Sequence, residues 1–458
     1  TWSFTSKEER INLFEKLYEI YKKNWDQMAK TISIEMGAPI DFSTELQTKT
    51  GASHIKSFKN ILKNFKFEKI LDEEKNQTIL YEPKGVCALI TPWNWPINQV
   101  NLKVIPALAS ACTVVLKPSE IAPLSSMLLA EMIDEVKFPA GVFNLVNGDG
   151  AVTGDALTSH PDVDMISFTG STRAGALISQ NAAKDFKRIS LELGGKGANI
   201  IFKDADSEAI ARGVLRCFRN SGQSCNAPTR MLVPTARYDE ALEIAREVAE
   251  TLVTGNPELE STQIGPVVSA AQFDKVQRLI SSGIEEKATL VTGGVGRPEH
   301  LDRGYFVKPT IFGGVTPEMS IFREEIFGPV LSIIAYENRE EAVKLANDTP
   351  YGLAAYVSGS DTSELMTYAR ELRAGQIHLN YTGGGTNAPF GGFKQSGMGR
   401  EGGPEGLGLP PEVPRERRGV ELRQRVLGGV LSGAESNLGS GEVLGGHAQR
   451  GRVAHEHG

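Results

Sequence analysis

Hydrophobic residues recur at helical spacing near the start of the chain. Ile11 and Phe14 fall on one helical face, and the pattern continues until Gly37 interrupts it. Two later apolar stretches, 65–70 and 77–81, flank a polar and acidic turn, which is typical of a β-hairpin. The first part of the chain is therefore predicted to be helical and to be followed by a hairpin.

From Val86 onward, short apolar runs alternate with segments of helical periodicity. The first series of predicted strands comprises residues 86–91, 113–116, 142–146, 164–168 and 188–192, with helices beginning near 97, 123, 151 and 171. The second series has strands at 199–202, 229–233, 330–335, 353–357 and 376–379, separated by helices near 207–219, 238–251, 270–281, 340–346 and 363–372. This α/β alternation is typical of parallel, doubly wound sheets, so we predict two Rossmann-like domains and a small hairpin element.

Composition and charge exclude several classes of protein. The 458 residues are enough for two or three domains, at roughly 150 residues each. The net charge is −7 and the basic residues are interspersed with acidic ones, which argues against nucleic acid as a partner. The longest nearly apolar run, residues 104–116, contains Pro106 and is too short to cross a membrane.

The cysteines and histidines predict neither a disulfide framework nor a metal site. The four cysteines include no C-x-x-C pair, and no histidine in the body of the chain has a partner at metal-ligand spacing. We therefore expect a reducing, cytoplasmic setting and no bound metal.

The two ends of the chain differ from its body. No methionine precedes Met28 and no secretory pattern is present, so we expect the native start to lie before Thr1. Residues 407–458 are rich in glycine and arginine and lack lysine, isoleucine and tryptophan. Because this tail has few large apolar groups to offset the entropy of ordering, we expect it to be disordered.

Unusual motifs follow the strands of the first series. Ligands of open α/β sheets bind beyond the carboxyl ends of the strands. There the sequence has Thr91-Pro92-Trp93-Asn94-Trp95-Pro96, Lys117-Pro118-Ser119-Glu120, Asn147-Gly148-Asp149-Gly150, Thr169-Gly170-Ser171 and Glu192-Leu193-Gly194-Gly195-Lys196.

Some of these residues suit a dinucleotide. Glu120 with Lys117 suits ribose hydroxyls, and Gly170-Ser171 at the start of a helix suits a phosphate. The usual G-x-G-x-x-G is absent, and the segment from Gly148 to Gly154 is only a near match. Ordinary turn glycines remain the alternative at this point.

Three further residues are candidates for catalysis, each with a plainer alternative. Cys225 lies in a small-residue loop whose backbone amides could lower the pKa of the thiol, whereas most cysteines are small buried hydrophobes. Glu192 ends an apolar strand beside two glycines and is either a general base or a solvated carboxylate. Asn94 is either an amide donor for an oxyanion or a turn residue.

Taken together, the motifs resemble the aldehyde dehydrogenase superfamily. The likeness extends from residue 1 to about residue 406. Six motifs in a fixed order carry it, namely residues 91–96, 117–120, 168–171 and 192–196, Gly222-Gln223-Ser224-Cys225, and Glu324-Glu325-Ile326-Phe327-Gly328-Pro329.

The resemblance implies a catalytic role for five residues. Cys225 would add to the aldehyde carbon, and Asn94 with the Cys225 backbone N–H would hold the oxyanion. Glu192 would activate the water that hydrolyses the thioester, and its presence favours hydrolysis over transfer to coenzyme A. Lys103 and Glu401 match positions of a proton relay, although either could be a surface charge.

The resemblance also implies the cofactor and the residues that bind it. NAD is favoured over NADP because the Glu120 carboxylate would repel a 2′-phosphate, although Lys117 could moderate that choice. Glu325 and Phe327 would contact the nicotinamide half of the cofactor from the second domain. The full predicted set is Thr91, Trp93, Lys117, Ser119, Glu120, Gly150, Gly170, Ser171, Leu193, Gly194, Glu325 and Phe327.

Domain limits and assembly follow from the same resemblance. It implies an NAD-binding domain (1–64 and 83–193), an oligomerisation hairpin (65–82), a catalytic domain (194–395), a family C-terminal segment (396–406) and an atypical tail (407–458). The family expects a homodimer or homotetramer, and we expect weaker assembly here because the tail replaces a strand and leaves a sheet edge unfilled.

Two alternatives to a general NAD-dependent aldehyde dehydrogenase stay open. One is a semialdehyde dehydrogenase or an NADP-preferring enzyme. The other, from a different class, is a catalytically silent binding or structural protein with intact motifs.

Overall fold

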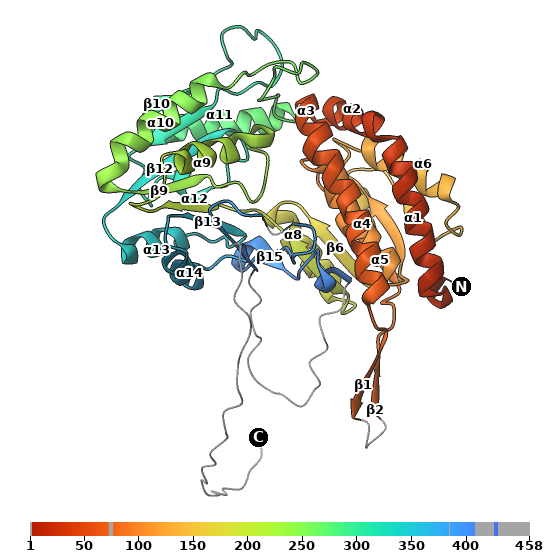
Figure 1. Ribbon diagram of the computed structural model, residues 1–458. Coiled ribbons are helices and arrows are strands. Elements are labelled where there is room, and N and C mark those ends of the chain that lie inside the picture. Colours follow the sequence, from red (N-terminus) through yellow and green to blue (C-terminus); the bar gives the residue numbers. More distant parts are fainter. Residues whose placement is uncertain (1, 73–76, 384, 408–425, 429–458) are drawn as a thin grey trace, which may run out of the picture.

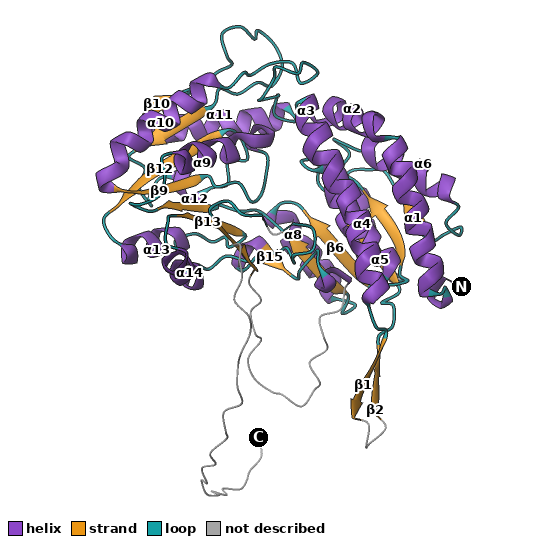
Figure 2. Ribbon diagram, in the orientation of Figure 1, coloured by secondary structure: helices purple, strands orange, loops and turns teal. Residues whose placement is uncertain are grey.

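The computed structural model of the chain describes residues 2–72, 77–383, 385–407 and 426–428. Two largely parallel sheets, each covered by helices, form the body, and a two-stranded hairpin projects from it (Figure 1, Figure 2). The predicted fold class is therefore confirmed. Within the described residues, no helix combines the length and the apolar character that a membrane span needs.

The helical start is present and is longer than predicted. It comprises α1 (Lys7–Lys23), α2 (Trp25–Met36), α3 (Ile40–Phe42), a π-helical turn (Ser43–Thr48) and α4 (Lys49–Asn64). Gly37 ends α2 with a φ of +78°, as the pattern predicts. The sequence prediction omitted residues 40–64, although Ile55, Phe58 and Leu62 are fully buried at helical spacing.

The first sheet has six strands in the order β15-β7-β6-β3-β4-β5. All neighbours pair in parallel except β15, which is antiparallel to β7. Its strands are β3 (Val86–Ile90), β4 (Thr113–Lys117), β5 (Phe143–Leu145), β6 (Met165–Thr169), β7 (Arg188–Glu192) and β15 (Gly397–Met398). Its helices are α5 (Pro96–Ala109), α6 (Leu124–Val136), α7 (Asp155–Ser159) and α8 (Thr172–Ala183).

The strand order of this sheet reverses between β3 and β6. The chain proceeds from β3 through β4 to β5 on one side and from β6 to β7 on the other. Such a switch point opens a crevice at the carboxyl ends of the strands, where ligands bind.

The second sheet has eight strands in the order β10-β11-β12-β9-β8-β13-β14-β16, and all pairs except β10–β11 are parallel. Its strands are β8 (Ala198–Ile201), β9 (Arg230–Pro234), β10 (Thr289–Thr292), β11 (Thr310–Gly313), β12 (Val330–Tyr336), β13 (Ala354–Ser358), β14 (Gln376–Leu379) and β16 (Val426–Gly428). Its helices are α9 (Glu208–Phe218), α10 (Tyr238–Thr251), α11 (Ala270–Glu285), α12 (Ser320–Arg323), α13 (Arg339–Asn347) and α14 (Thr362–Glu371). The prediction did not include β10 and β11.

The predicted hairpin is present as β1 (Glu68–Asp72) and β2 (Gln77–Leu80), paired antiparallel. Ile70 and Leu80 expose 61% and 60% of their surface. Its role in assembly stays a prediction.

The tail departs in part from expectation. Residues 426–428 form β16, which pairs in parallel with β14 and covers the edge of the second sheet. The expectation of disorder therefore does not hold for these three residues, whereas the unfilled edge expected in an assembly stays a prediction, because β16 pairs within its own chain. Apart from Leu407, the rest of the tail lies outside the described residues.

Arg230 is the largest fully buried side chain of the second sheet and binds three backbone carbonyls. Its guanidinium donates to Lys196 O at 3.1 and 3.0 Å, to Leu345 O at 2.8 Å and to Ala346 O at 2.8 Å. The contact with Lys196 holds the segment that enters the second sheet from the first.

Replacing Arg230 by methionine is expected to destabilise the protein. The carbonyls of Lys196 and Ala346 would stay buried without their guanidinium donors, and Leu345 O would keep only the N–H of Asp348, which should lower the free energy of unfolding by about 3 kcal/mol. Urea unfolding measures this change. Arg246→Met is the matched control, because Arg246 is exposed and its one salt bridge among the described residues is with Glu243. An unchanged urea midpoint for Arg230→Met would contradict the assignment.

Candidate active site

The predicted site residues come from both sheets and meet between them. Thr91, Lys117, Thr169 and Glu192 lie at the carboxyl ends of β3, β4, β6 and β7. The residues around Cys225 approach from the second sheet, in the connection between α9 and β9. We call this connection, residues 219–228, the cysteine loop.

The cysteine loop begins with three consecutive residues in the left-handed region. Asn220, Ser221 and Gly222 have φ values of +57°, +55° and +73°. A Cβ at Gly222 would collide with the carbonyl of Gly328, so only glycine fits there. The start of the loop is thus packed against the end of the Glu324–Pro329 motif.

Polar contacts fix the rest of the loop against the residues that follow β3. Asn94 Nδ2 donates to Gln223 O at 3.0 Å, and Asn220 Nδ2 donates to Asn94 O at 2.8 Å. Trp95 Nε1 donates to Ser224 Oγ at 2.9 Å. Asn94 and Cys225, predicted as partners in catalysis, therefore lie on two segments that are bonded to each other.

Sequence reasoning missed the contributions of Gln47, Trp95 and Asn220 to this network. Gln47, in the π-helical turn, is fully buried, and its Nε2 donates to Asn220 Oδ1 at 3.3 Å. No sequence signal identified Gln47, because the helical segment that contains it was not predicted. Trp95 was part of a predicted motif, but its hydrogen-bond partner Ser224 could not be predicted.

The connection between β7 and β8 is the third component of the site. A Cβ at Gly195 would collide with the Cys225 carbonyl oxygen, and one at Gly194 would lie 2.7 Å from Glu325 Oε2. Gly195 N donates to Glu325 Oε1 at 2.7 Å. These two glycines allow the cysteine loop and the Glu325 carboxylate to approach the backbone that begins at Glu192.

The expectation that backbone amides lower the pKa of Cys225 is wrong. Burial raises the pKa of the Cys225 thiol to about 12, and the carboxylates of Glu325 and Glu192 add to that rise. The amides of Asn226 and Cys225 act in the opposite direction but are outweighed. The thiol is therefore neutral in the free protein and needs a base before it can attack.

Glu192 is a candidate for that base. Its side chain is buried, at 2% exposure, and neither carboxylate oxygen has a hydrogen-bond partner among the described residues. Burial first, and then the charge of Glu401, raise the pKa of Glu192 well above its ordinary value, against opposing effects of Lys103 and Arg400. A raised pKa brings a carboxylate toward the range in which it can take up and release protons at neutral pH.

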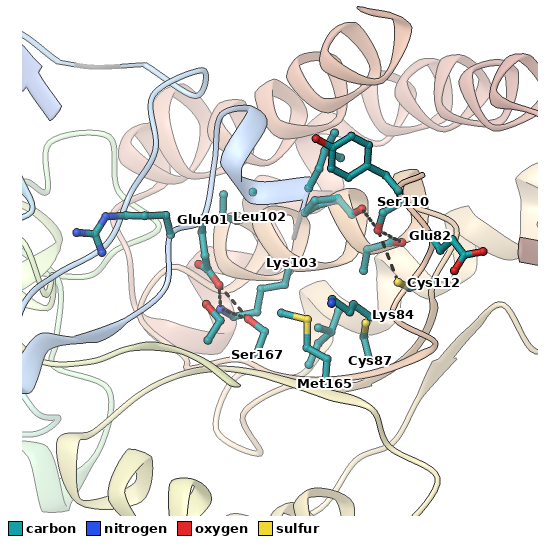
Figure 3. A pocket seen from close by; sticks show the side chains of 18 of the residues that line it. Glu82, Lys84, Cys87, Leu102, Lys103, Ser110, Cys112, Met165, Ser167 and Glu401 are labelled. Carbon is teal, nitrogen blue, oxygen red and sulfur yellow. Dashed lines mark hydrogen bonds and ion pairs between the residues drawn. The ribbon is translucent and has the colours of Figure 1, made fainter. Parts of the chain in front are cut away.

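Lys103 and Glu401 form a buried ion pair (Figure 3). Lys103 Nζ also donates to Ser167 Oγ at 3.1 Å, and Ser167 Oγ donates to Glu401 Oε1 at 3.0 Å. Neither residue is a surface charge, since their side chains are 0% and 7% exposed. The pair lies within electrostatic range of Glu192.

Residues predicted to bind the nicotinamide half of a cofactor face each other across the two sheets. The rings of Trp93 and Phe327 meet edge to face, with centroids 5.5 Å apart and planes at 86°. At the switch point between β3 and β6, the hydroxyls of Thr91 and Thr169 are buried and have no hydrogen-bond partner among the described residues. Such unpaired groups indicate a ligand there, so this part of the site fits a dinucleotide.

Residues predicted for the adenosine half also lie together. Lys117 Nζ donates to Gly148 O at 2.7 Å and lies 3.4 Å from Glu120 Oε2. The Glu120 side chain is 50% exposed and available to ribose hydroxyls. Ser171 caps α8 by accepting from Ala174 N at 3.2 Å, so it stands at a helix N-terminus, as predicted.

Four predicted cofactor residues show no feature of their own that points to a ligand. Ser119 Oγ accepts from Ile121 N, Leu193 N donates to Ser396 O, a Cβ at Gly150 would meet nothing within 4 Å, and Gly170 packs against the Phe168 ring. Gly194 differs, because its Cα lies close to the Glu325 carboxylate. Roles for the first four in binding stay predictions.

A basic and aromatic cluster next to the cysteine loop was also missed. Tyr356 donates to Asn226 O at 2.8 Å, and Arg216, Arg219 and Cys225 all lie within electrostatic range of its hydroxyl. Neither arginine forms a salt bridge with a described residue. The sequence did offer one signal for this cluster. Arg216 and Arg219 are one helical turn apart, and no acidic residue lies between them and Cys225.

Comparisons with known proteins agree with this geometry. A sequence model described as the aldehyde dehydrogenase family matches residues 1–409. A 3-succinoylsemialdehyde-pyridine dehydrogenase from a Pseudomonas species is 51% identical over 408 residues, which cover 89% of this chain and 85% of the relative.

Solved structures are similar as well. An aldehyde dehydrogenase from Bartonella henselae is 57% identical, with a TM-score of 0.88 over 89% of this chain and 86% of the other. A Mycobacterium tuberculosis aldehyde dehydrogenase complexed with NAD+ is 38% identical, with a TM-score of 0.87 over 89% and 84%. A mutant aldehyde dehydrogenase C from Pseudomonas syringae, complexed with NAD+ and octanal, is 48% identical, with a TM-score of 0.87 over 89% and 83%.

The raised pKa of Cys225 predicts slow alkylation of the free protein at neutral pH. Iodoacetamide reacts with the thiolate, so its rate at Cys225 should keep increasing to at least pH 10, whereas free cysteine levels off above its pKa of about 8.5. Peptide mass spectrometry at a series of pH values measures the rate at this thiol. A plateau below pH 8 would contradict the assigned electrostatics.

Proposed function

Because the chain belongs to the aldehyde dehydrogenase family, we propose that it oxidises an aldehyde to the carboxylic acid, with Cys225 as nucleophile and NAD as cofactor. The packing of Gly195 against the Cys225 carbonyl carries this proposal. That contact packs the segment that follows Glu192 against the loop that holds the thiol, which supports the pairing of Glu192 as base with Cys225 as nucleophile.

The first step is the attack of the thiol on the aldehyde. Glu192 accepts the proton of Cys225, either directly or through a water molecule, and the sulfur adds to the carbonyl carbon to give a thiohemiacetal. The pKa values of Glu192 and Cys225 are both raised, so a negative charge is disfavoured on either group. Transfer of the proton from Cys225 to Glu192 therefore moves one disfavoured charge from the carboxylate to the sulfur and creates no additional charge.

The oxygen of the former carbonyl carries the developing negative charge. One N–H of the Asn94 amide donates to Gln223 O, which holds the amide in place and leaves the second N–H available. That N–H and the backbone N–H of Cys225 stabilise the oxyanion.

The second half of the reaction releases the acid. Bound NAD supplies the acceptor for the hydride that leaves the thiohemiacetal carbon, which becomes a thioester on Cys225. Glu192 has to release the proton that it took from Cys225, and it then takes a proton from the water that attacks the thioester. Lys103, Ser167 and Glu401 are hydrogen-bonded to one another, and a water molecule would have to bridge them to Glu192 for a proton to leave by this route.

Thr91, Lys117, Glu120 and Glu325 would hold the cofactor. The half-exposed carboxylate of Glu120 beside Lys117 suits the two hydroxyls of an unmodified ribose, and its charge would repel a 2′-phosphate. We therefore favour NAD over NADP.

Substitution of the nucleophile tests this proposal. Cys225→Ala should reduce NADH formation from NAD and simple aldehydes by at least a thousandfold, because no covalent intermediate can form. Cys217→Ala is the matched control, since Cys217 is a fully buried thiol in α9 and should leave the rate nearly unchanged. Persistent turnover in Cys225→Ala, measured by NADH absorbance, would refute the role of the thiol.

A second candidate function is the oxidation of a semialdehyde with a terminal carboxylate. Arg216 and Arg219 lie beside Tyr356, close to the cysteine loop, and have no acidic partner in the described part of the chain. They could bind a carboxylate several atoms away from the aldehyde carbon. The Pseudomonas relative is named for a semialdehyde substrate, although its printed name does not specify a carboxylate.

Comparing charged and neutral aldehydes tests the second candidate. Arg219→Gln should lower kcat/KM for an ω-carboxy aldehyde by about tenfold to a hundredfold, the loss of one charge-assisted hydrogen bond, and leave a neutral aldehyde of equal length unchanged. Arg212→Gln is the control, because Arg212 lies on α9, the helix that ends just before Arg219, and pairs with Asp206 and Glu208. An equal loss for both aldehydes would argue against carboxylate recognition.

A further inference from the structure

Gln47 has no part in the reaction described above, yet it is fully buried beside the residues that carry the reaction. It lies in the π-helical turn Ser43–Thr48, a rare geometry that often occurs at functional sites. The helix α3 before this turn contacts the loop between α10 and α11, where Ile40 N donates to Pro257 O at 2.8 Å (Figure 1). The turn is therefore held in place and presents an amide to the cysteine loop.

The amide nitrogen of Gln47 has three acceptors. It donates to Asn220 Oδ1 at 3.3 Å, to Met36 Sδ at 3.3 Å and, at 3.5 Å, to Asn94 O. Two of these acceptors belong to residues of the candidate site, which links the π-helical turn to both segments of that site.

Hydrogen-bond chemistry determines how the Asn220 amide is oriented. Asn220 Nδ2 donates to Asn94 O at 2.8 Å and to Gln223 O at 3.2 Å. Backbone carbonyls can only accept, so the NH₂ group of Asn220 has to face them and its oxygen has to face Gln47. The donor that Gln47 supplies therefore selects this orientation, because the reversed amide would place its oxygen against two carbonyl oxygens.

Asn94 depends on the orientation of the Asn220 amide. Its backbone carbonyl accepts from Asn220, and its side-chain Nδ2 donates to the same Gln223 carbonyl that Asn220 contacts. The three residues thus form a closed set of hydrogen bonds around the amide that is proposed to meet the oxyanion. A donor in such a site acts only when it lies about 3 Å from the oxygen that becomes charged.

The cysteine loop has anchors that do not involve the π-helical turn. Ser221 Oγ donates to Gly265 O at 2.9 Å, and Val268 N donates to Gln223 Oε1 at 2.9 Å. These bonds hold the loop that bears the thiol from its other side. Loss of the Gln47 amide should therefore disturb Asn94 more than it disturbs Cys225.

We propose that Gln47 is a positioning residue for the oxyanion site, an inference that rests on the proposed function. The Gln47 amide orients the Asn220 amide, and Asn220 in turn holds Asn94 where its free N–H meets the developing negative charge. The hydrogen bonds that join these three residues, together with their burial, carry the inference. The effect belongs to the step in which the charge develops rather than to binding of the cofactor.

Gln47→Leu tests this role in the full chain. The rate of the first turnover with NAD and a simple aldehyde, followed by NADH absorbance in stopped flow, should fall about tenfold, while the KM for NAD stays within about twofold of the parent value. Gln27→Leu is the matched control, because Gln27 is exposed on α2 and its loss should leave the rate unchanged. An unchanged first turnover in Gln47→Leu would overturn the inference.

Alkylation separates the oxyanion site from the thiol itself. The reaction of a thiolate with iodoacetamide forms no oxyanion, so the rate at Cys225 in Gln47→Leu should stay within about twofold of the parent rate. A tenfold loss in both reactions would show that Gln47 supports the cysteine loop as a whole, and this result would contradict the specific role.

A double-mutant cycle tests whether Gln47 acts through Asn220. Asn220→Gly removes the amide and suits the φ of +57° at this position. In that background Gln47→Leu should cost less than about threefold, whereas a full tenfold cost would overturn the inference.

Two further measurements complete the test. Circular dichroism verifies folding, and Gln47→Met, which keeps the length of the side chain, replaces Gln47→Leu if the latter does not fold. Failure of the proposed function is distinguishable, because the parent chain would then form no NADH or Cys225→Ala would remain active.

Discussion

The site depends on the close passage of the β7–β8 connection along the cysteine loop. This short segment, residues 192–197, leaves the first sheet at Glu192 and enters the second. A Cβ at Gly195 would collide with the backbone carbonyl of Cys225, so this approach requires glycine, whereas a Cβ at Gly194 would meet only the end of the Glu325 side chain. Arg230 anchors the far end of the segment through Lys196 O. One backbone contact therefore fixes the base, the nucleophile and a predicted cofactor residue relative to one another.

The same enclosure determines the charge state of the site. Burial disfavours a thiolate at Cys225 and a carboxylate at Glu192, and each group would suffer further from a charge on the other. The free site is thus held near neutrality, and the buried Lys103–Glu401 pair lies within electrostatic range of Glu192. An enclosed thiol that becomes nucleophilic only together with its base is protected from side reactions.

Much of the fold was predictable, because the strands of both sheets are buried apolar runs separated by helical periodicity. Strands such as 188–192 and 376–379 occur at the predicted residues. The motif residues were predictable as well, because they follow these strands directly. Residues 40–64, β10 and β11 were missed, since their apolar positions are fewer or interrupted by polar ones.

What the sequence could not supply is information about distant neighbours. The pKa of Cys225 was expected to fall because the local loop offers backbone amides. Instead burial raises this pKa, and the carboxylates of Glu192 and Glu325, which are distant in sequence, raise it further. The Trp95–Ser224 bond and the cluster around Arg219 likewise join segments that no local pattern connects. The pairing of β16 with β14 depends on backbone positions rather than on residue type.

The most direct test of the central claim is the acyl-enzyme in a Glu192→Gln variant. The variant is mixed with NAD and an aldehyde, quenched in acid, and analysed by intact mass and peptide mapping. The variant keeps the shape of the side chain but removes the base of both steps. The account therefore predicts that the thioester on Cys225 forms much more slowly than in the parent enzyme and that, once formed, it is not hydrolysed. Steady NADH formation without an acyl group on Cys225 would contradict it.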